Sequence, residues 1–158
     1  MGVRLIAAFA VLLLGGGAFY LFLSRQEDDA NGLLRPDDPV LVSMGRDIYA
    51  ADCAGCHGAN GEGQRGWEKA SIENPLAPPH DGTGHTWEHP DTALFELTKT
   101  GLSTVACRTL DSGSMPKFEE TLSDEQIVAV LSYIKSRWPE HIRQQNAAIN
   151  RIYATQEN

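Results

Sequence analysis

The chain has 158 residues, of which 22% are charged and 42% are hydrophobic, and its formal net charge is −8. This composition excludes a disordered chain and a wholly membrane-embedded one, and the length suits one domain with an attached segment. The acidic balance argues against a nucleic-acid partner, because phosphates attract a basic surface. It suits a basic docking protein, although solubility alone also explains it.

Residues 5–23 form an N-terminal apolar run without a charged side chain. As a helix, this run would span roughly 28 Å, close to the hydrocarbon thickness of a bilayer. A cleavable signal peptide is the alternative, but its apolar region is usually about 7–15 residues long and ends at small residues. Here five large apolar residues, 19–23, follow the small ones. We therefore predict that residues 1–23 are an uncleaved transmembrane anchor.

A polar linker, residues 24–38, follows the apolar run. Asp38 as N-cap and Pro39 at the first helical position then predict a helix that runs toward Cys53. Gly45 lies inside this helix, where glycine costs about 1 kcal/mol relative to alanine. Its presence there indicates close packing against another element.

Beyond residue 57 the chain contains an irregular loop and three predicted helices. Residues 58–90 are rich in glycine and proline and predict the loop, and residues 91–100 predict a short helix capped by Gly101. A capping box at Ser123 starts a longer helix whose apolar face runs to Trp138. Residues 139–158 form a C-terminal extension, in which the spacing of Ile142, Ile149, Ile152 and Tyr153 predicts a final amphipathic helix.

The segment Cys53-Ala54-Gly55-Cys56-His57 is the attachment signature of a c-type haem. Two cysteines at this spacing can reach the two vinyl groups on one porphyrin edge, and the adjacent histidine can then place its imidazole under the iron. A thioredoxin-like redox pair would need a preceding strand, and a structural zinc site would need a second close pair of ligands. We therefore expect Cys53 and Cys56 to hold a single haem c, and His57 to ligate its iron.

Low-spin electron transfer also requires a second axial ligand. Met115, in Gly113-Ser114-Met115-Pro116, is the best candidate because core filling is less natural in such a loop. Met44 lies only nine residues before Cys53, on the helix that leads into the motif, and should face the core. The predicted iron ligands are therefore His57 and Met115.

These features together resemble the class I cytochromes c. In that family a helix with a glycine and an aromatic residue precedes the haem motif, a Met-Pro loop follows, and a last aromatic helix crosses the first. The resemblance covers roughly residues 39–138 and implies an all-α cytochrome c-like domain around one covalent haem. It also implies that Gly45 and Tyr49 pack against the Leu131–Trp138 face. A proline carbonyl should accept a hydrogen bond from His57, and Pro75, Pro78 and Pro79 are the candidates.

The chain also resembles bacterial membrane-anchored cytochromes, which carry electrons between respiratory complexes. The basic residues flanking the anchor are too evenly balanced to fix its orientation. In the cytochromes that this chain resembles, haem is attached covalently on the outer face of energy-transducing membranes. We therefore expect a single-pass protein of the bacterial inner membrane, with its haem domain in the periplasm and redox proteins as partners.

Three histidines, His80, His85 and His89, cluster late in the loop of residues 58–90. One interpretation is that this loop wraps a haem edge, with Trp87 or a histidine donating to a propionate. The other is a second metal site for an ion such as copper, assisted by Cys107 or Asp81, because imidazoles suit copper and zinc.

The functional prediction is a one-electron carrier rather than an enzyme. A haem enzyme would need an open iron position, and no distal acid–base pair is apparent in the sequence. A copper-binding or redox-sensing haem protein that uses the histidine loop is the alternative.

Overall fold

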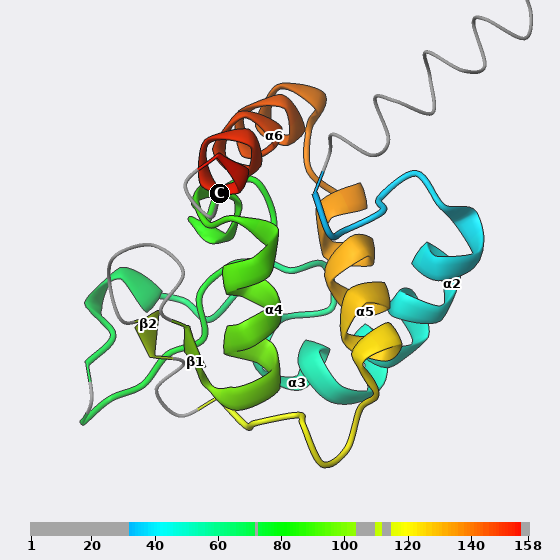
Figure 1. The fold of residues 1–158 in the computed structure, drawn as a ribbon. Coiled ribbons are helices and arrows are strands. Elements are labelled where there is room, and N and C mark those ends of the chain that lie inside the picture. Colours follow the sequence, from blue (N-terminus) through cyan, green and yellow to red (C-terminus); the bar gives the residue numbers. More distant parts are fainter. Residues whose placement is uncertain (1–31, 72, 104–109, 112–114, 156–158) are drawn as a thin grey trace, which may run out of the picture. The chain divides into compact units, whose positions relative to one another are not determined.

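The computed structural model describes residues 32–71, 73–103, 110–111 and 115–155 (Figure 1). The predicted anchor, residues 1–23, and Cys107 lie outside these described residues. Within them, no helix is long and apolar enough to cross a bilayer. The elements, in chain order, are α2 (Pro39–Ile48), η1 (Tyr49–Cys53), α3 (Ala54–His57), η2 (Trp67–Lys69), η3 (Thr86–Glu88), α4 (Asp91–Thr100), β1 (Leu102–Ser103), β2 (Leu110–Asp111), α5 (Asp124–Ser136) and α6 (Glu140–Ala154).

The described structure is mainly helical, as the all-α prediction requires. Its only extended pairing within the described ranges is a two-residue antiparallel ladder between β1 and β2. Apart from residue 72, which is not described, residues 58–90 carry only the two short 3₁₀ turns η2 and η3, so the prediction of an irregular loop is confirmed.

The predicted helix ends are confirmed by their capping bonds. Asp38 Oδ1 accepts from the amides of Val40 and Leu41, each at 3.0 Å. At the start of α5 the capping box is complete: Ser123 Oγ accepts from the Gln126 amide at 3.3 Å, and Gln126 Oε1 accepts from the Ser123 amide at 2.8 Å. These local bonds satisfy amide donors that have no partner inside the helix.

The crossing of α2 and α5 is the main helix–helix contact of the described residues (Figure 1). A Cβ on Gly45 would overlap the backbone carbonyl of Ala129 and lie 2.9 Å from the Cβ of Tyr133. The ring centroids of Tyr49 and Tyr133 are 5.4 Å apart. The packing that the family resemblance implied for Gly45 and Tyr49 is therefore confirmed, and glycine is needed because the two backbones approach so closely.

The core is built mainly from α5, which buries residues around most of its circumference. A helix that is apolar on nearly all sides must be covered on several faces. The buried hydrophobic cluster consists of Leu34, Leu41, Tyr49, Leu94, Ile127, Val128, Ala129, Val130, Leu131, Ile134, Trp138 and Ile142.

The C-terminal helix α6 confirms the predicted final helix but not its predicted buried face. Ile142 is buried, whereas Ile152 is 56% exposed. The buried positions are Ile142, Asn146 and Asn150, which recur every four residues. The spacing of the apolar residues does not mark the buried face of α6, because two of the inward-facing side chains, Asn146 and Asn150, are asparagines that hydrogen-bond to buried polar groups.

Candidate functional site

The two motif cysteines and the histidine follow an irregularity in the first helix. Helix α2 widens into one π-helical turn, Tyr49–Cys53, before the short helix α3 carries Cys56 and His57. Such turns occur frequently at functional sites because they change the direction of the side chains that follow. Gly58 then ends α3 with a positive φ of 84°.

The two cysteines are free thiols, with Cys53 half-buried and Cys56 exposed. Burial raises the pKa of the Cys53 thiol to about 11, and the negative charge of Asp52 acts in the same direction. Before haem is attached, Cys53 is therefore a protonated thiol at neutral pH. Neither sulfur is committed to a disulfide, so both remain available for covalent attachment.

His57 is buried, and its Nδ1 lies 2.8 Å from the backbone carbonyl oxygen of Pro78. A carbonyl can only accept, so Nδ1 carries the proton and Nε2 presents an unprotonated lone pair. Burial lowers the pKa of His57, and the Pro78 bond offsets part of this shift. A neutral imidazole with one nitrogen anchored and the other free is the form that ligates a metal. The structure thus selects Pro78 from the three proline candidates.

Pro78 is held in place by a ladder between two parts of the loop. Gln64 donates to Ala77 O at 2.8 Å, and His80 donates to Gly61 O at 2.8 Å, so the ladder flanks Pro78 on both sides. Gly63 has a φ of 69°, and a Cβ there would lie 2.5 Å from Pro79 N. This position requires glycine because the two loop strands pass so close together.

His80 lies directly against His57. The two ring centroids are 3.8 Å apart with an interplanar angle of 21°, so the imidazoles are stacked. The Nδ1 atom of His80 is 3.0 Å from the Thr86 hydroxyl, and the His80 carbonyl accepts from the Trp138 indole at 2.8 Å. Burial lowers the pKa of His80 to about 3, with His57 and His85 adding to the effect.

The other loop histidines do not assemble into a metal site. The ring centroids of His85 and His89 are 5.6 Å apart and edge to face, and His85 stacks on Trp67. No group of three or more histidine, cysteine or acidic side chains in the described part of the chain could hold a metal ion. The second-metal interpretation therefore gains no support there, and its possible ligand Cys107 lies outside the described residues.

The indole of Trp87 was one candidate donor to a haem propionate. In the structure its Nε1 donates instead to the backbone carbonyl of Gly84 at 2.9 Å. The indole N–H is therefore hydrogen-bonded within the loop and stabilises it, rather than pointing to a propionate.

Met115 is half-buried and begins the last described stretch of chain before α5. Shortly after it, the amide of Phe118 donates to Thr98 O at 3.2 Å and that of Glu119 donates to Lys99 O at 3.0 Å. The buried Phe118 ring anchors this segment further. Met44 is partly buried against the core, as predicted, and also lines an open groove of about 770 Å³ beside α2.

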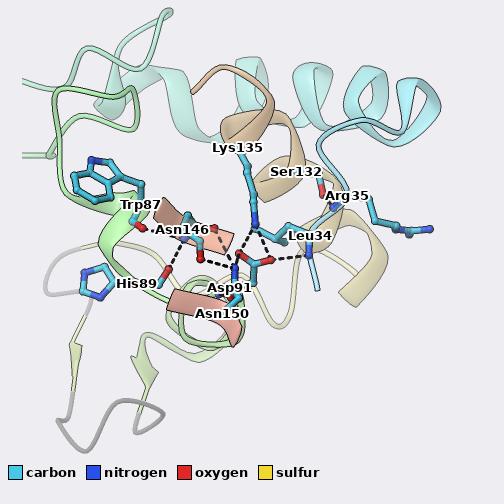
Figure 2. A network of polar contacts seen from close by, with 9 residues as sticks. All are labelled: Leu34, Arg35, Trp87, His89, Asp91, Ser132, Lys135, Asn146 and Asn150. Atoms are coloured by element: carbon cyan, nitrogen blue, oxygen red, sulfur yellow. Dashed lines mark hydrogen bonds and ion pairs between the residues drawn. The ribbon is translucent and has the colours of Figure 1, made fainter. Parts of the chain in front are cut away.

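A buried polar network behind the loop was not found by sequence reasoning (Figure 2). Asn146 Nδ2 donates to the carbonyls of Trp87 and His89, each at 2.9 Å. Asn150 accepts from the Asp91 amide at 2.8 Å and donates to its carboxylate at 3.0 Å. The available signal was the spacing of Ile142, Asn146 and Asn150 on one helical face. Through this network α6 fixes the end of the histidine loop.

These features define a small helical protein with a paired-thiol and histidine site on one short turn, which suits a covalently attached metal cofactor. A family model described as Cytochrome c matches residues 42–138, well over half of the chain. The chain therefore belongs to the cytochrome c family, binds haem c covalently and takes part in haem-based electron transfer. No curated protein and no solved structure matches it.

Proposed function

We propose that Cys53 and Cys56 form the two thioether bonds to haem c and that His57 is the first axial ligand. The observation that carries this assignment is the 2.8 Å contact between His57 Nδ1 and Pro78 O, which leaves Nε2 free to bind iron. Each thiol would supply the sulfur of one thioether bond and the hydrogen that adds to the neighbouring vinyl carbon, so the attachment would need no oxidant.

We propose Met115 as the second axial ligand. It is the methionine of a Gly-Ser-Met-Pro sequence, half-buried and next to a segment tied to the end of α4. Met44 is the less suitable candidate because it packs against the core from α2. Histidine and methionine together would saturate the iron and raise its reduction potential, which suits one-electron exchange rather than substrate chemistry.

The bound haem supplies the Fe(III)/Fe(II) couple, and the chain supplies its environment. Pro78 orients His57, the core formed by α2 and α5 excludes water, and the loop behind His57 is held by α6. A rigid environment around the haem suits electron transfer, because few protein groups have to move when the charge on the iron changes.

The proposed cellular role is that of a membrane-tethered carrier between redox partners of a respiratory chain. The support is the uncharged run of residues 5–23, whose length matches a bilayer. On this proposal the protein crosses the bacterial inner membrane once and its haem domain faces the periplasm. The acidic surface favours a basic donor or acceptor protein through complementary fields.

Substitution of the two candidate methionines tests the ligand assignment. Met115→Ala should lower the reduction potential and let the reduced protein bind carbon monoxide, because the iron then has an open position. Met44→Ala is the matched control and should retain the potential and remain closed to carbon monoxide. If Met115→Ala binds carbon monoxide no better than the wild type, Met115 is not the ligand.

The attachment residues are tested separately on a denaturing gel stained for haem. Cys53→Ala combined with Cys56→Ala should remove the stain, since no thioether can then form. Stain that survives in the double variant would reject the assignment of these cysteines.

A further inference from the structure

His80 is fixed in the protein by bonds that do not involve His57. Its amide donates to Gly61 O at 2.8 Å, and its carbonyl accepts from Trp138 Nε1 at 2.8 Å. Its side chain is held through Nδ1 by the hydroxyl of Thr86. The ring stacked on His57 is therefore restrained at both its backbone and its side chain.

The hydrogen bonds of Thr86 determine which His80 nitrogen carries the proton. The Thr86 hydroxyl donates to Pro79 O at 3.2 Å, and it has only one hydrogen to give. It must therefore accept from His80, so Nδ1 of His80 is protonated. This bond sets the plane of the His80 ring relative to the loop.

Pro78 alone does not fix the plane of the His57 imidazole. A hydrogen bond restrains the position of Nδ1, but a carbonyl accepts over a broad range of directions, so the ring can still tilt. A flat ring with its centroid 3.8 Å away on one face removes that freedom, because tilting would drive one ring into the other.

We propose that His80 is a positioning residue that sets the plane of the His57 imidazole. The proposal rests on the proposed function, since it matters only if His57 ligates the iron. The plane of an axial imidazole determines which iron orbitals it overlaps, and with them the distribution of unpaired spin over the oxidised haem. Supporting groups of this kind tune a metal centre through the ligand they orient.

The test compares two substitutions in the full-length, haem-bound protein. His80→Phe keeps a flat ring against His57 but loses the Thr86 bond, whereas His80→Leu keeps apolar bulk and loses the flat face. Proton NMR of the oxidised protein reads the spread and order of the haem methyl resonances, which follow the imidazole plane. We expect His80→Leu to change that order and His80→Phe to keep the wild-type order.

His85→Leu is the matched control, because it makes the same change at an exposed histidine of the same loop. The His85 ring stacks on Trp67 and not on His57. It should leave the methyl resonances unchanged. His80→Val is the second variant, in case His80→Leu does not retain haem. It also removes the flat face against His57, so it should shift the same resonances in the same direction.

A His80→Leu spectrum that superimposes on the wild type, or a His80→Phe spectrum that changes as much as that of His80→Leu, would overturn the proposal. So would an unchanged His80→Val spectrum where His80→Leu retains no haem. Failure of the proposed ligation is distinguishable, because the wild-type protein itself would then lack the low-spin absorption bands of a six-coordinate haem. In that case the order of the methyl resonances would carry no meaning for His57.

Discussion

Lys135 of α5 donates from Nζ to both carboxylate oxygens of Asp91 at the start of α4, at 2.9 and 3.0 Å. The side chains are only 3% and 1% exposed. The same carboxylate accepts from the Leu34 amide at 3.0 Å and from Asn150 at 3.0 Å. One buried pair thus joins the segment before α2 to α4, α5 and α6, as Figure 2 shows.

Removing one member of this pair should be costly. Lys135→Met leaves the Asp91 carboxylate buried without its cation and should lower the free energy of unfolding by about 3 kcal/mol or more. Denaturant unfolding of the haem-bound protein at pH 7 measures the loss. Lys99→Met is the control, because Lys99 also joins α4 to α5 through an aspartate, Asp124, that is 66% exposed. An exposed pair is worth about 1 kcal/mol or less, so equal losses in the two variants would contradict this account.

Gly45→Ala should destabilise the protein at the crossing of α2 and α5. The added methyl group would overlap the Ala129 carbonyl, and backbone atoms cannot rotate away as a side chain can. We expect a loss of about 1 to 3 kcal/mol in the free energy of unfolding, typical of overpacking. Ser43→Ala, an exposed position on the same helix, should change it by no more than about 0.5 kcal/mol. A stabilised Gly45→Ala variant would show that the helices separate at little cost.

Asn146→Asp should loosen the histidine loop without changing side-chain volume. The amide that donates to the Trp87 and His89 carbonyls would become a carboxylate oxygen facing two acceptors. The expected cost is about 2 kcal/mol or more, because one oxygen of a buried charge would face two carbonyl acceptors and no donor. Gln145→Glu makes the matching change at the exposed neighbouring position. Hydrogen exchange of the amides in residues 84–91 should accelerate in the first variant only, and unchanged exchange would mean that α6 does not restrain this loop.

Tyr49 should contribute stability that is lost at alkaline pH. Its hydroxyl donates to Gly58 O at 2.9 Å, and burial is the main cause that raises its pKa from 10.0 to about 12. The folded state therefore favours the protonated phenol, and this contribution is complete below about pH 10 and disappears as pH rises toward 12. Tyr49→Phe should cost about 1 kcal/mol at pH 8 through the lost hydrogen bond. The gap to the wild type should narrow above pH 10, and a constant gap up to pH 11 would contradict the assigned pKa.

The mature protein should keep residues 1–23. The apolar run is too long for the core of a signal peptide and has large residues after its small ones. Intact mass spectrometry of haem-stained protein from membranes measures this directly. Replacing residues 1–23 with a cleavable signal peptide should move the stain to the soluble fraction. A native chain found in that fraction and starting near Phe19 or Ser24 would reject the tether.

The sequence by itself determined the features that depend on residues close together in the chain. Asp38 capped α2 and the Ser123 capping box started α5, because each bond joins residues no more than three apart. The spacing of Cys53, Cys56 and His57 likewise pointed to haem, since the chemistry needs only one short turn. Gly45 indicated close packing, although the partner surface came from the family resemblance.

Only the tertiary structure decided the contacts between distant residues. The sequence offered three prolines for His57, and the loop ladder that places Pro78 depends on how residues 61–64 pair with 77–80. The stacking of His80 on His57 joins residues 23 positions apart and has no periodic signal. Asn146 and Asn150 are polar, and polarity alone does not reveal that a side chain has a buried partner. Their burial is favourable because the packing of the helices brings hydrogen-bond partners within reach. These partners are the carbonyls of Trp87 and His89 for Asn146 and the carboxylate of Asp91 for Asn150.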